Sequence, residues 1–120
     1  MGIAQKSFES ADEVRTPDKA RVEVVDLGSA KAMRMTAQPG WRWSESVKPV
    51  AGTDSCRALH IGAVVSGTLH VRHDDGTEQD LAPGSAYVIE PGHDAWVTST
   101  EPFVAVEFEG STVDTYAKPS

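Results

Sequence analysis

The chain of 120 residues carries a net charge of −7, with 39% hydrophobic and 24% charged residues. This length fits one domain, and this composition can build a hydrophobic core, which excludes a wholly disordered chain. No apolar run approaches the roughly 20 residues of a membrane-spanning helix, and no export signal is visible. The sequence therefore predicts a cytoplasmic protein that does not contact a membrane.

The acidic residues are concentrated towards the end of the chain. Residues 74–120 contain ten acidic residues and one basic residue, whereas residues 1–40 contain six of each. Because an acidic segment repels phosphate backbones, nucleic acid is not an expected partner. The single cysteine, Cys56, excludes an internal disulfide and every cysteine-rich zinc module.

Valine dominates the aliphatic residues, with 14 Val against four Leu and three Ile, and β-branched side chains favour strands. Residues 1–20 read as a polar lead-in, where the spacing of Ser10 and Glu13 is that of a helix capping box and Pro17 ends any short helical turn. Strands are then expected at residues 22–27, 33–37 and 41–44. The alternation in the last of these would place Trp41 and Trp43 on one face.

A loop is expected over residues 47–57, followed by a second group of strands. Turn residues separate these strands, and the Asp75-Gly76 pair gives the strongest hairpin signal. The expected strands are residues 60–65, 68–73, 78–81, 87–89, 95–99 and 103–108. About nine strands without a long helix are typical of a β-sandwich or barrel.

Between Gly40 and Phe108, three glycines and a Pro-Gly pair mark expected turns, at Gly40, Gly67, Gly84 and Pro91-Gly92. In the spacing of these residues the block resembles the cupin family, whose members are small β-barrels of jelly-roll type. The segment from Pro91 to Trp96 is also similar to a bacterial cupin subgroup without an assigned activity. The resemblance implies an all-β, single-domain jelly-roll barrel at residues 21–110, with a lead-in at 1–20 and a loose tail at 111–120.

Cupins that bind a metal hold it with three histidines and a glutamate. The positions that match these ligands are Ser46, Lys48, His60 and Ala95, of which only His60 is a usual metal ligand. A divalent ion needs three or four ligands, so the resemblance implies that the usual cupin metal site is lost and that no cofactor is bound.

A different metal site remains an alternative. His93 has the strand parity of Ala95 and would then point inward, beside His60. With a carboxylate from Glu45 or Glu90, these two histidines would form a set that suits iron or zinc. Manganese and nickel are the other divalent metals that such a site could bind.

Two further groups of residues have plainer interpretations. Cys56 is expected to be a small buried hydrophobe, because an extended chain would place it about 13 Å from His60. Both residues could bind one ion only if the chain bends sharply between them. His70 and His73 flank the Asp75-Gly76 turn and are expected to be exposed.

A small-molecule pocket inside the barrel is the main functional expectation, because aromatic walls with a few polar groups are typical of such sites. Lys48 inside a barrel would favour a ligand that carries a carboxylate. For the tryptophans themselves, a role in filling the core or in a dimer interface is preferred over a role in a ligand pocket. The expected pocket residues are Trp41, Trp43, Ser46, Lys48, His60, Tyr87 and Trp96.

The residues leave several functions open. The first is a cupin that binds a small organic ligand with little or no catalysis. The second is an oxygenase- or isomerase-type enzyme, in which His60 and His93 hold a metal or one of them acts as a general base while Lys48 stabilises an oxyanion. The third is a module whose surface binds a partner protein. A homodimer is expected because cupins commonly pair through a sheet edge or an outer sheet face.

Overall fold

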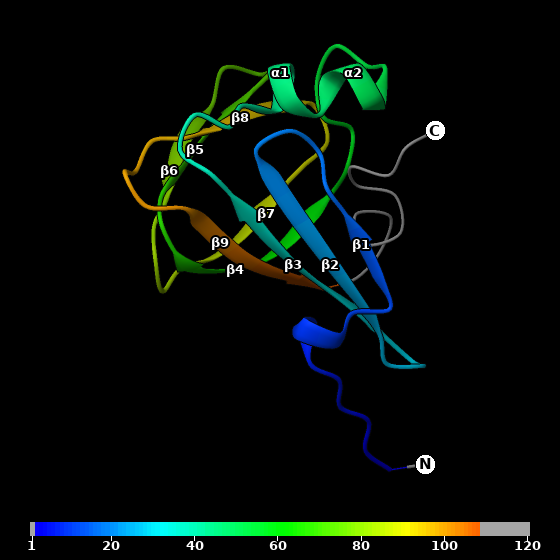
Figure 1. The fold of residues 1–120 in the computed structure, drawn as a ribbon. Coiled ribbons are helices and arrows are strands. Elements are labelled where there is room, and N and C mark those ends of the chain that lie inside the picture. Colours follow the sequence, from blue (N-terminus) through cyan, green and yellow to red (C-terminus); the bar gives the residue numbers. More distant parts are fainter. Residues whose placement is uncertain (1, 109–120) are drawn as a thin grey trace.

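The computed structural model describes residues 2–108, which form nine strands in two antiparallel sheets (Figure 1). The larger sheet has the order β1-β2-β3-β9-β4-β7, and the smaller one has the order β6-β5-β8. The larger sheet contains β1 (Glu13–Arg15), β2 (Ala20–Asp26), β3 (Lys31–Ala37), β9 (Phe103–Phe108), β4 (His60–Ser66) and β7 (Ala86–Ile89). The smaller sheet contains β6 (Glu78–Leu81), β5 (Leu69–His73) and β8 (His93–Val97).

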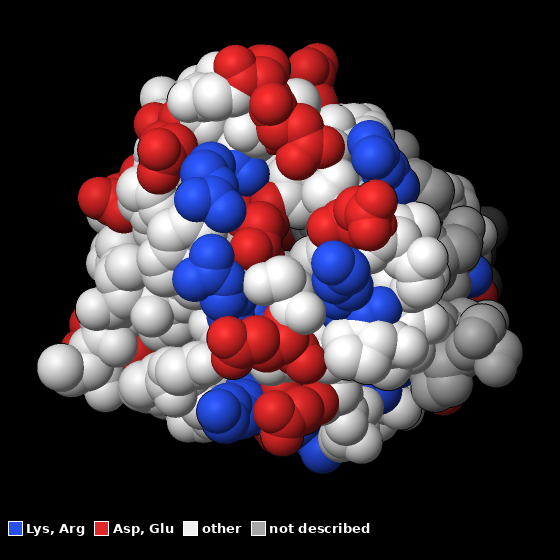
Figure 2. Space-filling view, turned by 90° about the horizontal axis from the view of Figure 1, so that it is seen from above, with Lys and Arg blue, Asp and Glu red and all other residues white. Residues whose placement is uncertain are grey.

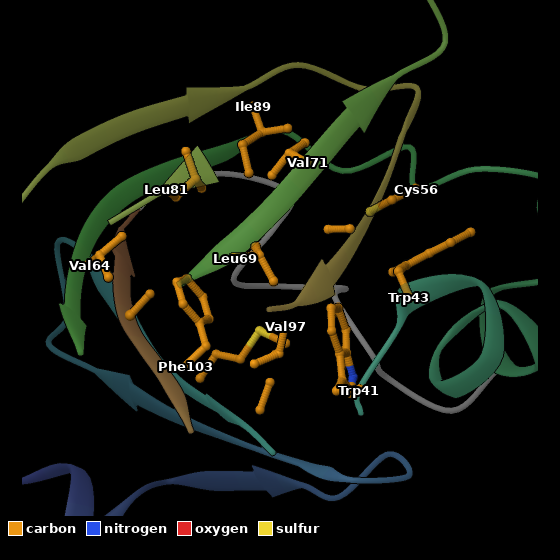
Figure 3. Close-up of a cluster of buried hydrophobic side chains, with 14 of the residues drawn as sticks. Trp41, Trp43, Cys56, Val64, Leu69, Val71, Leu81, Ile89, Val97 and Phe103 are labelled. Carbon is orange, nitrogen blue, oxygen red and sulfur yellow. The ribbon is translucent and has the colours of Figure 1, made fainter. Parts of the chain in front are cut away.

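The hydrophobic core fills the space between the two sheets (Figure 3). Side chains alternate along the strands: on β8, His93, Ala95 and Val97 are buried, while the two residues between them are only partly covered. Met33 and Ala105 are fully buried on β3 and β9. The strand periodicity of the sequence therefore gives the two sheets their inner faces.

Short helices replace one expected strand and part of one expected loop. The expected strand at residues 41–44 is wrong, because helix α1 (Trp43–Ser46) begins inside it and Arg42 makes only an isolated bridge to Trp96. Helix α2 (Lys48–Ala51) follows at once and ends at Gly52, whose φ of 74° terminates the turn. Both helices lie at one end of the sheets (Figure 1).

The N-terminal segment contributes a strand rather than only a lead-in. Residues Glu13–Arg15 form β1 and pair with β2, so that Glu13 lies opposite Val24. A 3-10 helix, η1, spans Phe8–Ser10, just before the short helical turn that the sequence allowed at residues 10–13. The tail expected at residues 111–120 lies outside the described residues.

The outer face of the smaller sheet carries an ionic cluster around His70. Its Nδ1 atom lies 2.8 Å from Asp80 Oδ1, and its Nε2 atom lies 2.7 Å from Glu78 Oε1. The hydrogen bond to Glu78, followed by that to Asp80, raises the pKa of His70 above its usual value. The side chain of His70 is thus half-buried in this cluster rather than fully exposed.

This cluster should make the stability depend on pH. A raised pKa in the folded state means that the stabilisation is fully present below the unfolded pKa of about 6.5 and is lost as the pH rises through the folded pKa. We expect His70→Gln to lower the free energy of unfolding by about 0.2–1 kcal/mol more near pH 6 than near pH 9. The difference is small because the partners of His70 are partly solvated. Urea denaturation of both proteins at the two pH values measures this, and an equal cost at both would contradict it.

Candidate metal centre

A thiol and two imidazoles meet in the interior between the two sheets. Cys56, His60 and His93 are all buried, and their candidate ligand atoms lie within 4.8 Å of one another. The Sγ atom of Cys56 lies 3.5 Å from Nε2 of His60. The two imidazole rings meet edge to face with centroids 5.0 Å apart.

The chain brings these residues together by changing sheets between Cys56 and His60. Cys56 bridges to His93, at the start of β8, with its N–H donating to the His93 carbonyl at 2.7 Å. His60 opens β4 and pairs instead with Ile89 of β7 in the larger sheet. Because the residues between Cys56 and His60 cross from one sheet to the other, the extended separation of about 13 Å does not apply. Cys56 is one of the buried residues of the core cluster that Figure 3 draws.

The outer nitrogen of each imidazole is held by an acceptor. His60 Nδ1 donates to Glu107 Oε1 at 2.8 Å, and His93 Nδ1 donates to the Glu90 carbonyl at 2.8 Å. The Tyr87 hydroxyl donates to the other oxygen of Glu107 at 2.6 Å. Since carboxylate and carbonyl oxygens only accept, both Nδ1 atoms carry hydrogen, and the Nε2 atoms are left to face the thiol.

The electrostatics of the cluster favour a thiolate. Burial raises the pKa of the Cys56 thiol, but hydrogen bonds with His60 and His93 and the charges of these rings outweigh it and lower the pKa to about 6. Burial lowers the pKa of His60, but the Glu107 carboxylate and Cys56 outweigh it and raise the pKa to about 10. Both directions favour a thiolate beside a protonated His60 ring, and a metal that binds His60 Nε2 would displace the proton from that nitrogen.

A cavity of about 20 Å³ lies beside the two histidines. It is also lined by Trp41, Tyr87 and Glu107, and its size suits one water molecule or ion rather than an organic ligand. The indole Nε1–H of Trp41 is buried and has no acceptor among residues 2–108. The interior at this point is small and is lined by both polar and apolar side chains.

The structure separates the expected pocket residues into two groups. Trp41, Trp43, His60 and Tyr87 line the small cavity, and Ala95 forms part of its wall. Ser46 is buried on α1 but is not among the lining residues.

Lys48 and Trp96 lie outside, contrary to expectation. Lys48 stands on α2 with 43% of its side chain exposed and its Nζ atom 3.9 Å from Asp54, because the helix turns it away from the interior. Trp96 is on the outer face of β8, where its ring stacks with the guanidinium of Arg42 at 4.2 Å. The expectation that Lys48 points into the barrel is therefore wrong.

The remaining candidates are placed as follows. Glu45 is exposed on α1, and Glu90 has an exposed side chain while its carbonyl binds His93. Glu107 was missed by the sequence reasoning, although it follows the buried Phe103 and Ala105 at the same strand parity. An acidic residue on the apolar face of a strand was the signal that could have found it.

The face of the molecule that carries α1 and α2 has mixed charge. Acidic and basic side chains are interspersed there, and no continuous basic patch is visible (Figure 2). Arg42 pairs with Asp94 at 3.3 Å and Arg57 with Asp74 at 3.9 Å. This face therefore offers no concentrated positive charge to an anionic partner.

No family model matches the sequence, and no curated protein matches it. Similar solved structures include a protein of unknown function from Rhizobium leguminosarum bv. viciae 3841, with 17% identity, 90% of this chain and 96% of that chain covered, and a TM-score of 0.64. An RmlC-like cupin from Shewanella frigidimarina NCIMB 400 is 15% identical, with 86% of each chain covered and a TM-score of 0.57. The cupin domain of an XRE family transcriptional regulator from Enterobacter cloacae is 15% identical, with 76% of this chain and 95% of that chain covered and a TM-score of 0.55.

The chain therefore has the cupin fold, as the glycine spacing predicted. Its barrel is not closed, since no pairing of strands in the described part joins the larger sheet to the smaller one. Identities of this size show the fold and carry no activity with them. Among the helices that the structure describes, none is long and apolar enough to cross a membrane.

Proposed function

We propose that this cupin-fold protein binds one divalent transition-metal ion through Cys56, His60 and His93. The observation that carries the proposal is the convergence of one thiol and two imidazoles in a buried site. Two ligands of a tetrahedral zinc ion, with bonds of about 2.3 Å to sulfur and about 2.0–2.1 Å to nitrogen, lie about 3.5 Å apart. The distance from Cys56 Sγ to His60 Nε2 is 3.5 Å.

The donor set fits a metal of intermediate softness. Thiolate and imidazole ligands together suit zinc or iron better than magnesium or calcium, which prefer oxygen. Three protein ligands leave a further coordination position, as in catalytic zinc sites. A metal bound here would act as a Lewis acid and would lower the pKa of a water in that position.

The surroundings of the site support the same function. Histidine ligands commonly donate their outer N–H to a carboxylate or a carbonyl, which fixes the tautomer and the orientation of the ring. Glu107 does this for His60, and the Glu90 carbonyl does it for His93. The Tyr87 hydroxyl in turn fixes the Glu107 carboxylate. These groups would hold both Nε2 atoms towards one point without themselves touching the metal.

An organic ligand inside the barrel has less support. The internal cavity of about 20 Å³ is far below the roughly 300 Å³ at which small-molecule sites begin. Lys48, on which the expectation of a carboxylate ligand rested, is outside the barrel. The proposed function is therefore metal binding, with any organic substrate approaching from the surface.

The homodimer stays a prediction. Exposed apolar side chains lie on the outer face of β4 and β7, where Val65 is 61% and Val88 63% exposed. Ile61, which is 38% exposed, lies directly opposite Val88 in the strand pairing.

Cobalt binding tests the metal site. Chelator-treated protein is expected to bind one equivalent of Co²⁺ and to develop a thiolate-to-cobalt charge-transfer absorption. Cys56→Ser should lose this absorption, and His93→Ala should bind cobalt far more weakly, because two protein ligands remain. Equilibrium dialysis and absorption spectra measure both effects.

His73→Ala is the matched control, because His73 pairs with His93 across β5 and β8 but donates its Nε2–H to the Pro91 carbonyl. This variant should bind cobalt as the unmodified protein does. The proposal is overturned if the unmodified protein binds no cobalt, or if Cys56→Ser and His93→Ala both bind it normally.

A further inference from the structure

A groove of about 330 Å³ opens between the edges of the two sheets. Its two rims are edge strands: β6 of the smaller sheet and β7 of the larger one. The apolar side chains of Val71, Leu81, Val88 and Ile89 form one part of the lining. A volume of this size is in the range of small-molecule sites.

The groove lies directly behind the candidate metal centre. Ile89 lines both the groove and the small cavity beside His60 and His93. The same residue pairs with His60 across β4 and β7. Glu90 follows it, lines the groove, and accepts the hydrogen bond from His93 through its carbonyl. One layer of side chains therefore separates the groove from the proposed metal ligands.

The charged groups of the groove are all acidic. Asp75 and Glu90 line it, and no lysine or arginine does. Asp75 accepts the Thr77 N–H at 2.8 Å, and this bond, together with the Thr77 side chain, lowers the pKa of its carboxyl, so that it remains ionised.

The other groove residues include no lysine or arginine. The histidine of the groove, His73, donates from Nε2 to the Pro91 carbonyl at 2.9 Å, and its Nδ1 atom accepts the Asp75 N–H and lies 3.2 Å from Asp75 Oδ1. Arg57, whose guanidinium lies 3.9 Å from Asp74, is not among the lining residues.

We propose that the groove between β6 and β7 binds a small molecule with an apolar body and a cationic amine, at a site separate from the Cys56–His60–His93 centre. Val71, Leu81 and Val88 would contact the apolar body, while Asp75 and Glu90 would pair with the amine. A carboxylate-bearing molecule of the same size would bind more weakly, because it meets two carboxylates and no lysine or arginine among the lining residues.

Three probes of matched shape test the inference: benzylamine, benzyl alcohol and benzoate. Each is titrated into the metal-free, isotope-labelled protein, and backbone amide shifts of groove residues such as Thr77 and Gln79 are followed by NMR. Benzylamine is expected to shift these amides and to bind more tightly than the alcohol, whereas benzoate should not saturate. Asp75→Asn and Glu90→Gln should each weaken benzylamine binding about two- to fivefold, and the double variant about tenfold, since the carboxylates are partly solvated.

Glu78→Gln is the matched control, because it removes the same charge from β6 on the face that binds His70. Asp75→Asn retains an acceptor for the Thr77 N–H, so the turn is kept. Equal binding of benzoate and benzylamine, or benzylamine binding that neither groove variant weakens, would overturn the inference. Cobalt binding is measured separately. The amine titration can therefore be interpreted even if the protein binds no cobalt, and the cobalt result stands even if the groove binds no amine.

Discussion

Replacing Glu107 with alanine is expected to lower the free energy of unfolding by about 3–5 kcal/mol, because it breaks a buried ion pair from one side. The Glu107 side chain is buried and accepts hydrogen bonds from His60 Nδ1 at 2.8 Å and from the Tyr87 hydroxyl at 2.6 Å. Without the carboxylate, the ring of His60 would lose the group that raises its pKa. Urea denaturation followed by circular dichroism measures the loss.

Two further variants separate the charge of Glu107 from its packing. Glu101→Ala removes an exposed carboxylate just before β9 and should change the stability by less than about 0.5 kcal/mol. Glu107→Gln keeps the volume and one acceptor oxygen, so it should be more stable than Glu107→Ala while weakening cobalt binding about 10–100-fold. A loss below about 1 kcal/mol in Glu107→Ala would contradict the assignment of a paired buried charge.

Replacing Trp41 with alanine is expected to lower the free energy of unfolding by about 3–5 kcal/mol, since it removes a large side chain from the core. Trp41 is 2% exposed, and its indole N–H has no acceptor among the described residues. Trp41→Phe keeps an aromatic ring and removes this unpaired donor, so it should cost only about 1–2 kcal/mol. Denaturation curves from circular dichroism compare the two variants without relying on tryptophan fluorescence.

The control for this series is Trp96→Ala on the outer face of β8. Trp96 is only partly covered and stacks with Arg42, so its loss should cost less than that of Trp41. If Trp41→Phe were as destabilising as Trp41→Ala, the indole nitrogen would have a stabilising partner in solution. The absence of an acceptor would then no longer explain the difference in cost.

The residues on and beside β7 contribute to two separate sites, the proposed metal centre in the interior and the groove at the edge of the sheet. Ile89 faces the interior beside His60, while Glu90 lines the groove and holds His93 through its carbonyl. A substitution at Ile89 would therefore act on both sites, whereas Asp75 and Cys56 each report on one. This separation is what allows the metal and the amine experiments to be interpreted independently.

The cupin fold could be predicted from the sequence because its turns need particular residues. Gly67 has a φ of 73°, and a Cβ there would collide with the Pro102 carbonyl and lie 2.6 Å from Phe103 Cα. No other residue fits such a position without strain, so this turn of the fold requires a glycine that can be recognised in the sequence. The parity of His93 with Ala95 left an inward-facing His93 as an alternative, and the structure buries this side chain.

Short motifs were less informative, because two or three residues do not define a period. Trp41 and Trp43 are spaced as on a strand, yet Trp43 opens α1, where hydrogen bonds such as Val47 N to Trp43 O at 2.9 Å turn the chain. The buried state of both indoles could be expected from their hydrophobicity, whereas the backbone that buries them could not. The inward position of Lys48 failed for the same reason, because it depended on a strand that is a helix.

Only the tertiary structure could decide the composition of the site. Cys56 and His60 come together because Cys56 pairs with β8 and His60 with β7. The local spacing of residues in the sequence does not indicate which strands of different sheets they will pair with. Glu107 reaches His60 across 47 residues of sequence, through the pairing of β9 with β4. The sequence by itself determined which residues face inward, since the side-chain period of a strand is local; the tertiary structure determined which of them meet, since that depends on contacts between strands far apart in the chain.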